Sequence, residues 1–305
     1  MRQVTLPLRF VLTLITVSSS VPAATVSREV LVRDHLRQST TVIQVTGVLY
    51  DSTEGSWVGS RPGFEELPTP AYDWTVPPIG NRKPLSPTKT ELAWPARMIG
   101  RLDQFRDDSI TGQRCSGMLV GPRHFLTGAH CVLSGPEYWV SDSFCVRPGY
   151  NLKQNASGYT CIRVAASTLL KSAERDINLR TSDDDWAILE LTSDVGSELG
   201  WAQIGPIRVS MSGRNVHVLG YPHYALPTTD PAQDTSSKTD TACHSWAPLY
   251  YQPDLGSVRQ WTPDVPGWPG ESGSPIFYCP SAACRLGPVR IIGTRWTSQT
   301  ISSID

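Results

Sequence analysis

The chain has 305 residues and a formal net charge of −1, and charged residues make up 18% of it. A near-neutral chain offers no electrostatic reason to bind nucleic acid or an acidic membrane surface, so we expect neither partner. Its 24 glycines and 25 prolines are typical of a turn-rich β protein. The length allows one large domain or two small ones with a sizeable apolar core.

The first residues have the layout of a secretory signal peptide. Arg2 and Arg9 precede the apolar run 10–17, and small residues follow as far as Ala23. A buried N-terminal strand would explain neither the basic start nor the small residues, and the run is too short to span a bilayer. Residues 1–23 are therefore predicted to be a signal peptide, and the protein to be secreted and extracellular, with no membrane anchor.

Residues 24–95 differ in composition from the C-terminal two thirds of the chain. Residues 42–50 are a predicted strand, whereas residues 62–95 contain eight prolines, which favour an extended linker over a regular ladder or helix. A signal peptide followed by such a stretch suggests a propeptide that is removed from a zymogen. The alternative is an N-terminal extension that is never removed.

From Arg97 onward the chain is a series of short apolar segments divided by Gly, Pro, Asn and Ser turns. The predicted strands are 98–102, 115–122, 124–127, 185–191, 216–222, 275–278 and 289–293. Because no long stretch has helical periodicity, the pattern predicts an all-β barrel or sandwich. Asn155-Ala156-Ser157 is an acceptor sequon for N-glycosylation in a predicted surface loop.

The seven cysteines suit an oxidising compartment, where disulfides persist. Three pairs each bracket a segment or a short turn, and we predict bridges between them, although connectivity does not follow from sequence alone. The predicted pairs are Cys115 with Cys131, Cys145 with Cys161, and Cys279 with Cys284. Cys243 is left over, either as a free thiol or as a sign of different pairing. The cysteines lack paired Cys-X-X-Cys spacing, so we expect no metal site.

Three motifs carry candidate chemistry. Residues 270–275 read Gly-Glu-Ser-Gly-Ser-Pro, in which glycines allow a sharp turn around the hydroxyl of Ser272. His130 lies in Thr127-Gly128-Ala129-His130-Cys131, and Asp185 heads an apolar strand. An isolated glycine turn or histidine is usually structural, but the order His130, Asp185, Ser272 is the one found in chymotrypsin-type enzymes.

These motifs, together with Cys115-Ser116-Gly117, resemble the chymotrypsin-like (trypsin-like) serine proteases over residues 96–296. The segments Gly220-Tyr221-Pro222 and Ile292-Gly293-Thr294-Arg295-Trp296 are closer to the glutamyl endopeptidase branch than to the pancreatic branch. The resemblance implies a protease domain over 96–305, made of two six-stranded β-barrels with the active site between them. His130 and Asp185 would lie in the first barrel and Ser272 in the second.

The resemblance also implies a mechanism. Ser272 is the expected nucleophile, His130 the general base and Asp185 the residue that orients the imidazole. Asp183 and Asp184 compete with Asp185, which alone matches the family's Asp-X-Ala-X-Leu register. The N–H groups of Gly270 and Ser272 would form the oxyanion hole. We expect a monomeric endopeptidase that acts on proteins or peptides and needs no cofactor.

The chain departs from the family at several points. Glu271 replaces an aspartate that, in pancreatic-type relatives, receives a newly cut N-terminus. Ile99-Gly100 resembles such a cut site but lies too close to Cys115, so we interpret Ile99 as core of the first strand. The chain ends nine residues after Trp296, where relatives continue, so we expect a second barrel truncated at its C-terminus. The rival interpretation is a secreted binding protein that keeps the protease fold without catalysis.

Arg295 stands where glutamyl endopeptidases have a histidine of the specificity pocket. An arginine there would keep a positive charge and add a planar fork suited to a carboxylate, which favours cleavage after Glu or Asp. The alternative is that Arg295 points to solvent or is neutralised by Glu271, which would leave a pocket without acidic preference.

Overall fold

The computed structural model describes residues 24–49, 83–84, 95–106, 109–135, 138–141, 143–151, 154–155, 161–170, 185–204, 215–221, 243–248, 250–252, 259–261, 270–278 and 290–294. Strands dominate this part of the chain. Its helical segments are the short turns η1 (Ala96–Met98), η2 (Ala129–Cys131) and α2 (Gly196–Leu199). Among these residues, no helix has the length and apolarity needed to cross a membrane. The prediction of an all-β fold is confirmed.

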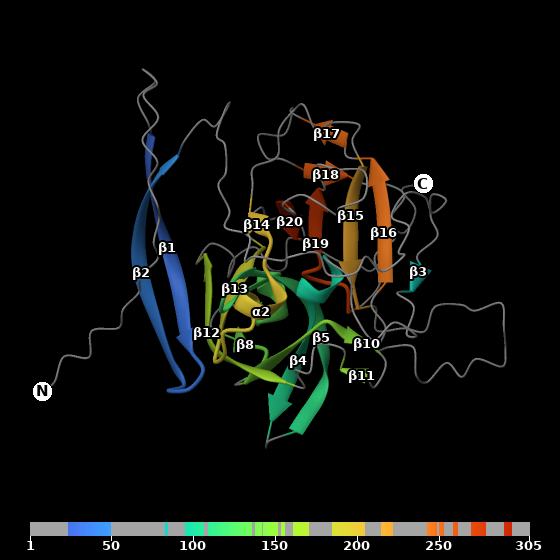
Figure 1. The fold of residues 1–305 in the computed structure, drawn as a ribbon. Helices are drawn as coiled ribbons and strands as arrows, with labels where there is room; N and C mark the ends of the chain where they lie inside the picture. Colours follow the sequence, from blue (N-terminus) through green and yellow to red (C-terminus); the bar gives the residue numbers. More distant parts are fainter. Residues whose placement is uncertain are drawn as a thin grey trace, which may run out of the picture.

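Six strands close into a first barrel, drawn in green and yellow in Figure 1. In sheet order they are β13 (Ala187–Leu191), β6 (His124–Thr127), β5 (Ser109–Gly121), β4 (Ile99–Arg106), β9 (Phe144–Pro148) and β12 (Ile162–Leu170). Pairing of β12 with β13 closes the ring. Alternate residues of β13 are buried, as expected of strands whose one face lines a core.

A second sheet of six strands lies against the first barrel, and Figure 1 draws most of it in orange to red. Its order is β14 (Gln203–Ile204), β20 (Arg290–Thr294), β19 (Pro275–Tyr278), β15 (Asn215–Gly220), β16 (Cys243–Pro248) and β3 (Lys83–Pro84). Small hairpins are formed by β7 (Leu133–Gly135) with β8 (Tyr138–Trp139), β10 (Tyr150–Asn151) with β11 (Gln154–Asn155), and β17 (Tyr250–Gln252) with β18 (Arg259–Trp261). Leu219, Tyr221 and Phe277 join the core cluster of the first barrel, so the two sheets share apolar packing.

The strands predicted from the sequence all have counterparts in the structure. Ile99 is fully buried on β4, as its interpretation as first-strand core requires. The proline-rich segment contributes Lys83–Pro84, which pairs with the start of β16. Such a two-residue bridge is compatible with proline at a sheet edge.

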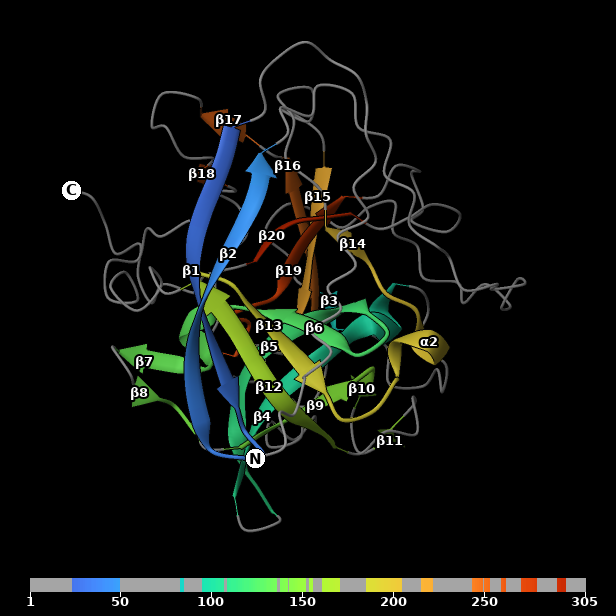
Figure 2. The ribbon, with the colours of Figure 1, turned by 90° about the vertical axis from the view of Figure 1, so that its left-hand side faces the viewer.

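The N-terminal segment forms a hairpin that extends the first barrel's sheet. Strands β1 (Ala24–Asp34) and β2 (Ser39–Leu49) pair along their whole length, and β1 pairs with the C-terminal half of β12. Strand β9 pairs with the other end of β12, at Ile162 and Arg163. Figure 2 shows the blue hairpin running alongside β12. The sequence predicted β2 but neither β1 nor its docking.

Side chains of the hairpin enter the barrel core. Leu31 is buried in the main core cluster. His35 is also buried, its Nε2 lies 2.7 Å from the Ser167 hydroxyl, and its ring meets Trp139 and Phe144 edge-on. The N-terminal hairpin is therefore a structural part of the first barrel.

We predict that Leu31→Ala lowers the free energy of unfolding by about 2–5 kcal/mol, because it removes buried methyl groups and leaves a cavity. Leu36 in the same hairpin is 67% exposed, so Leu36→Ala should change stability by less than about 0.5 kcal/mol. Urea unfolding of both variants measures the difference. Equal stabilities would contradict the docked hairpin.

The second sheet buries a titratable group, His217 on β15. Its ring stacks on Phe277 with centroids 5.5 Å apart, and burial lowers its pKa from 6.5 to about 4. A desolvated imidazole favours its neutral form, whereas in the unfolded chain it is protonated at a higher pH. Between about pH 6.5 and 4 the unfolded state therefore binds more protons than the folded state.

We predict that the free energy of unfolding falls as the pH is lowered through this window, with His217 contributing up to about 1.4 kcal/mol per pH unit. In His217→Leu the dependence should be shallower. Urea unfolding between pH 7 and pH 4 provides the measurement. Identical slopes for the two proteins would show that His217 does not titrate in this way.

Candidate functional site

Strand pairing brings Asp185 beside the turn that carries His130. Thr127 of β6 pairs with Ala187 of β13 in an antiparallel ladder. Continuing that register past the end of β6 sets the residues after Thr127 opposite those before Ala187. The chain leaves β6 through η2, and Asp185 precedes β13 by two positions. The two side chains therefore meet although 55 residues separate them.

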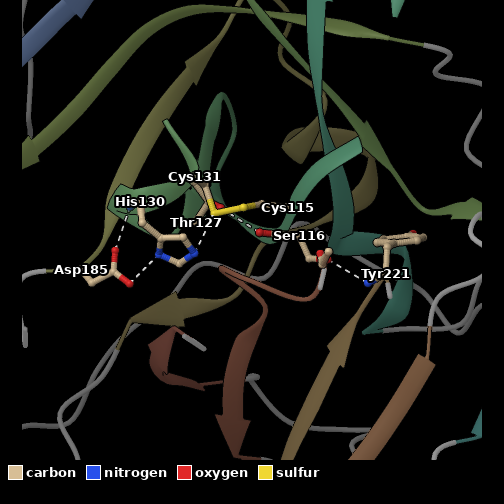
Figure 3. The surroundings of a disulfide bond; sticks show 8 residues. Cys115, Ser116, Thr127, His130, Cys131, Asp185 and Tyr221 are labelled. Atoms are coloured by element: carbon tan, nitrogen blue, oxygen red, sulfur yellow. Dashed lines mark hydrogen bonds and ion pairs between the residues drawn. A yellow bond between two sulfur atoms is a disulfide. The ribbon is translucent and has the colours of Figure 1, made fainter. Parts of the chain in front are cut away.

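Asp185 holds His130 through two hydrogen bonds. The backbone N–H of His130 donates to Oδ1 at 2.9 Å, and Nδ1 lies 2.7 Å from Oδ2 (Figure 3). A carboxylate only accepts hydrogen bonds, so Nδ1 carries the proton and Nε2 of the neutral ring carries the lone pair. Both side chains are partly buried, at 17% and 15% exposed, which shields the pair without removing it from solvent. This arrangement sets the tautomer and orientation that a general base needs.

A disulfide ties the histidine turn to β5. Cys131, next to His130, is bonded to Cys115, and Nε2 of His130 lies 3.7 Å from the Cys131 sulfur. These three residues are the group of candidate metal ligands found within the described part of the chain. Bonded to each other, the sulfurs offer no thiolate to a metal ion. The geometry there supports the turn and does not make a metal centre.

Ser272 lies in a tight turn before β19. Gly270 and Gly273, on either side of it, have φ angles of 89° and 75°, a backbone conformation that residues other than glycine rarely adopt. The backbone N–H of Ser274 donates to the Glu271 carbonyl at 2.9 Å, which closes the turn. Ser272 and Glu271 are both buried.

This turn packs directly on the first barrel next to the histidine. Ser116, which follows Cys115 on β5, donates its N–H to the Ser272 carbonyl at 2.8 Å. A Cβ on Gly273 would overlap the Thr127 hydroxyl and lie 2.7 Å from the Gly128 nitrogen. Glycine is therefore required where the turn meets the segment leading to His130. The fold brings the three sequence-predicted residues His130, Asp185 and Ser272 to one region.

The remaining predicted residues are less completely described. The second predicted disulfide, Cys145 with Cys161, is present and links β9 to the start of β12. Asn155 lies in β11, where it pairs with Tyr150, and Cys243 begins β16. Residues 1–23, Cys279, Cys284 and Arg295 lie outside the described residues.

One residue of this region was missed by sequence reasoning. Ser116 belongs to the Cys-Ser-Gly motif, but the motif drew attention only to its cysteine. Its hydroxyl donates to the Gly270 carbonyl and accepts from the backbone N–H of Tyr221, each at 2.8 Å. A serine in a strand carries no local sign of such contacts, because Tyr221, just after β15, and Gly270, in the turn before β19, are both distant in the sequence.

One family of known proteins matches the larger part of the chain. Residues 115–298 match the trypsin-like peptidase domain. No curated protein sequence matches the chain. A Glu endopeptidase solved in complex with MPD is 21% identical, with a TM-score of 0.48 over 65% of this chain and 80% of that one.

Two further proteases have similar structures. The VesB protease of Vibrio cholerae is 19% identical, with a TM-score of 0.48 over 73% of this chain and 61% of that one. A thermostable serine protease, AL20, from an extremophilic microorganism is 19% identical, with a TM-score of 0.45 over 62% of this chain and 81% of that one. The family assignment depends on the domain match, which spans more than half of the chain. The chain therefore belongs to the family of trypsin-like peptidase domains, and with that family it has the chymotrypsin-like serine protease fold.

Proposed function

We propose that the protein is a secreted serine endopeptidase whose catalytic residues are His130, Asp185 and Ser272. The family match supports a serine peptidase. The observation that carries the residue assignment is the pair of hydrogen bonds that Asp185 accepts from the backbone N–H and the ring of His130. A histidine that served only to pack beside a disulfide would have no need of a carboxylate at Nδ1.

In the proposed reaction, Ser272 Oγ attacks the carbonyl carbon of the substrate while Nε2 of His130 accepts its proton. Asp185 keeps the proton on Nδ1 and stabilises the imidazolium that forms. The N–H groups of Gly270 and Ser272 donate to the developing oxyanion. When the C–N bond breaks, His130 returns the proton to the leaving amine, and water then hydrolyses the acyl-enzyme by the same steps. The chemistry requires no cofactor.

Maturation is proposed to follow the division of the chain into residues 1–23, 24–95 and 96–305. Removal of a signal peptide at 1–23 would export the protein to an oxidising compartment, with which the disulfides are compatible. Any later cleavage would fall between residues 50 and 95. Since β1 pairs with β12, the N-terminal hairpin would remain on the barrel after such a cut.

We predict that Ser272→Ala abolishes both peptide hydrolysis and labelling by a fluorophosphonate probe. His130→Ala and Asp185→Asn should lower kcat by about 10⁴-fold or more, because each removes part of the proton-transfer machinery. Probe labelling and peptide assays on secreted, purified protein test this. Circular dichroism confirms that each variant is folded.

Two outcomes would contradict the proposal. Labelling of the Ser272→Ala protein would show that the nucleophile lies elsewhere. A folded wild-type protein that neither reacts with the probe nor cleaves peptides would favour the rival, a binding protein on the same fold.

We further propose that the enzyme prefers Glu or Asp on the acyl side of the cleaved bond. The proposal depends on the position of Arg295 in the motif Ile292–Trp296, where a cationic fork suits a carboxylate. The alternative is neutralisation of Arg295 by the buried Glu271.

We predict that a peptide library shows enrichment of Glu and Asp at that position, and that Arg295→Ala removes the enrichment while general esterase activity remains. The loss should be largest for acidic substrates, because a carboxylate in a dry pocket needs a cationic partner. A preference of the wild-type enzyme for Lys, Arg or large apolar residues would exclude the acidic pocket.

A further inference from the structure

Ser116 makes hydrogen bonds in four directions although it is completely buried. Its N–H donates to the Ser272 carbonyl, and its hydroxyl donates to the Gly270 carbonyl. The hydroxyl also accepts from the N–H of Tyr221, and the Ser116 carbonyl accepts from the Thr127 hydroxyl. Each of these distances is 2.8 Å. Figure 3 shows Ser116 between the disulfide and Tyr221.

These bonds act on the turn that carries Ser272. Three successive carbonyls of the turn each accept a hydrogen bond. Ser116 donates to the carbonyls of Gly270 and Ser272, and the N–H of Ser274 donates to the carbonyl of Glu271. In a planar trans peptide the N–H points opposite to the carbonyl, so holding a carbonyl also directs the next N–H. Through these carbonyls Ser116 holds the Gly270–Glu271 peptide and the Ser272–Gly273 peptide. The Glu271–Ser272 peptide, which supplies the Ser272 N–H, lies between them.

The hydroxyl has a second task, since it joins the turn to Tyr221 at the end of β15. It has one proton to donate, which goes to Gly270, and its lone pair receives the N–H of Tyr221. Without the hydroxyl, two buried backbone groups would lose this partner: the N–H of Tyr221 after β15 and the carbonyl of Gly270 before β19. Buried polar groups seek replacement partners, so the turn would shift from its present position.

We propose that Ser116 is a positioning residue for the nucleophile turn: it holds the carbonyls of Gly270 and Ser272 so that the Ser272 hydroxyl and the neighbouring N–H donors stay in place. The proposal depends on Ser272 being the nucleophile. Preorganised donors act on the transition state more than on bound substrate. Ser116 therefore affects kcat and the rate of covalent labelling, with little effect on KM.

The test compares Ser116→Ala with Ser274→Ala. Ser274 is a buried serine two residues after the nucleophile, and its hydroxyl has no hydrogen-bond partner within the described residues. We predict that Ser116→Ala lowers kcat and the fluorophosphonate labelling rate by about 10- to 100-fold with KM changed less than about 3-fold, since small misplacements of a catalytic turn have effects of this size. Ser274→Ala should label at the wild-type rate.

Active-site titration separates misplacement from unfolding. A misplaced turn gives full titration at a slow rate, whereas partial unfolding gives a reduced amplitude at the normal rate, and the second result would overturn the proposal. If Ser116→Ala yields no folded protein, Ser116→Cys, which has a slightly larger side chain and a weaker donor, is expected to label slowly too. Labelling at the wild-type rate by either folded variant would also overturn it.

A further measurement does not depend on activity. In hydrogen exchange followed by mass spectrometry, residues 270–278 should exchange faster in Ser116→Ala than in Ser274→Ala, while β13 is unchanged. Unchanged exchange in that segment would refute the proposed positioning role of Ser116. If the wild-type protein is not labelled but the two variants still differ in exchange, the proposed nucleophile is refuted and the positioning role of Ser116 is supported.

Discussion

The close contact between the Ser272 turn and strands β5 and β6 is the constraint on which the proposed site depends. Backbone from the second sheet approaches backbone from the first barrel so closely that Gly273 has no room for a side chain. Buried hydrogen bonds from Ser116 and tight packing keep the Ser272 turn in contact with β5. Because proteins pack densely and deform little, such a contact fixes the position of the second sheet relative to the first barrel.

Two other links give the histidine side of the site similar rigidity. The disulfide from Cys131 to Cys115 joins η2 to β5, the strand that also holds the Ser272 turn. Asp185 is set by the pairing of β13 with β6, and its carboxylate binds both the backbone and the ring of His130. Each proposed catalytic group is therefore positioned by strands or a covalent link, which is the rigidity that preorganised catalysis requires.

The first barrel also uses chain from outside the matched domain, which begins at residue 115. Strand β1 covers the half of β12 that β9 leaves free, and Leu31 and His35 enter the core. A strand edge that loses its neighbour exposes unpaired backbone groups and apolar side chains. Residues 24–49 thus have a structural reason to stay on the barrel.

The sequence by itself determined the local features: short strands, sharp glycine turns, and the motifs around His130, Asp185 and Ser272. These follow from short-range rules, since glycine permits positive φ at Gly270 and Gly273, and apolar alternation marks β13. Only the tertiary structure decided that β1 completes the sheet on β12 and that Ser116 joins Gly270 to Tyr221. The first contact spans 132 residues between His35 and Ser167, and the second spans 154 between Ser116 and Gly270. A serine or an alternating strand can satisfy its hydrogen bonds with many partners, and the partner is selected only when the folded chain brings one donor and one acceptor together out of water.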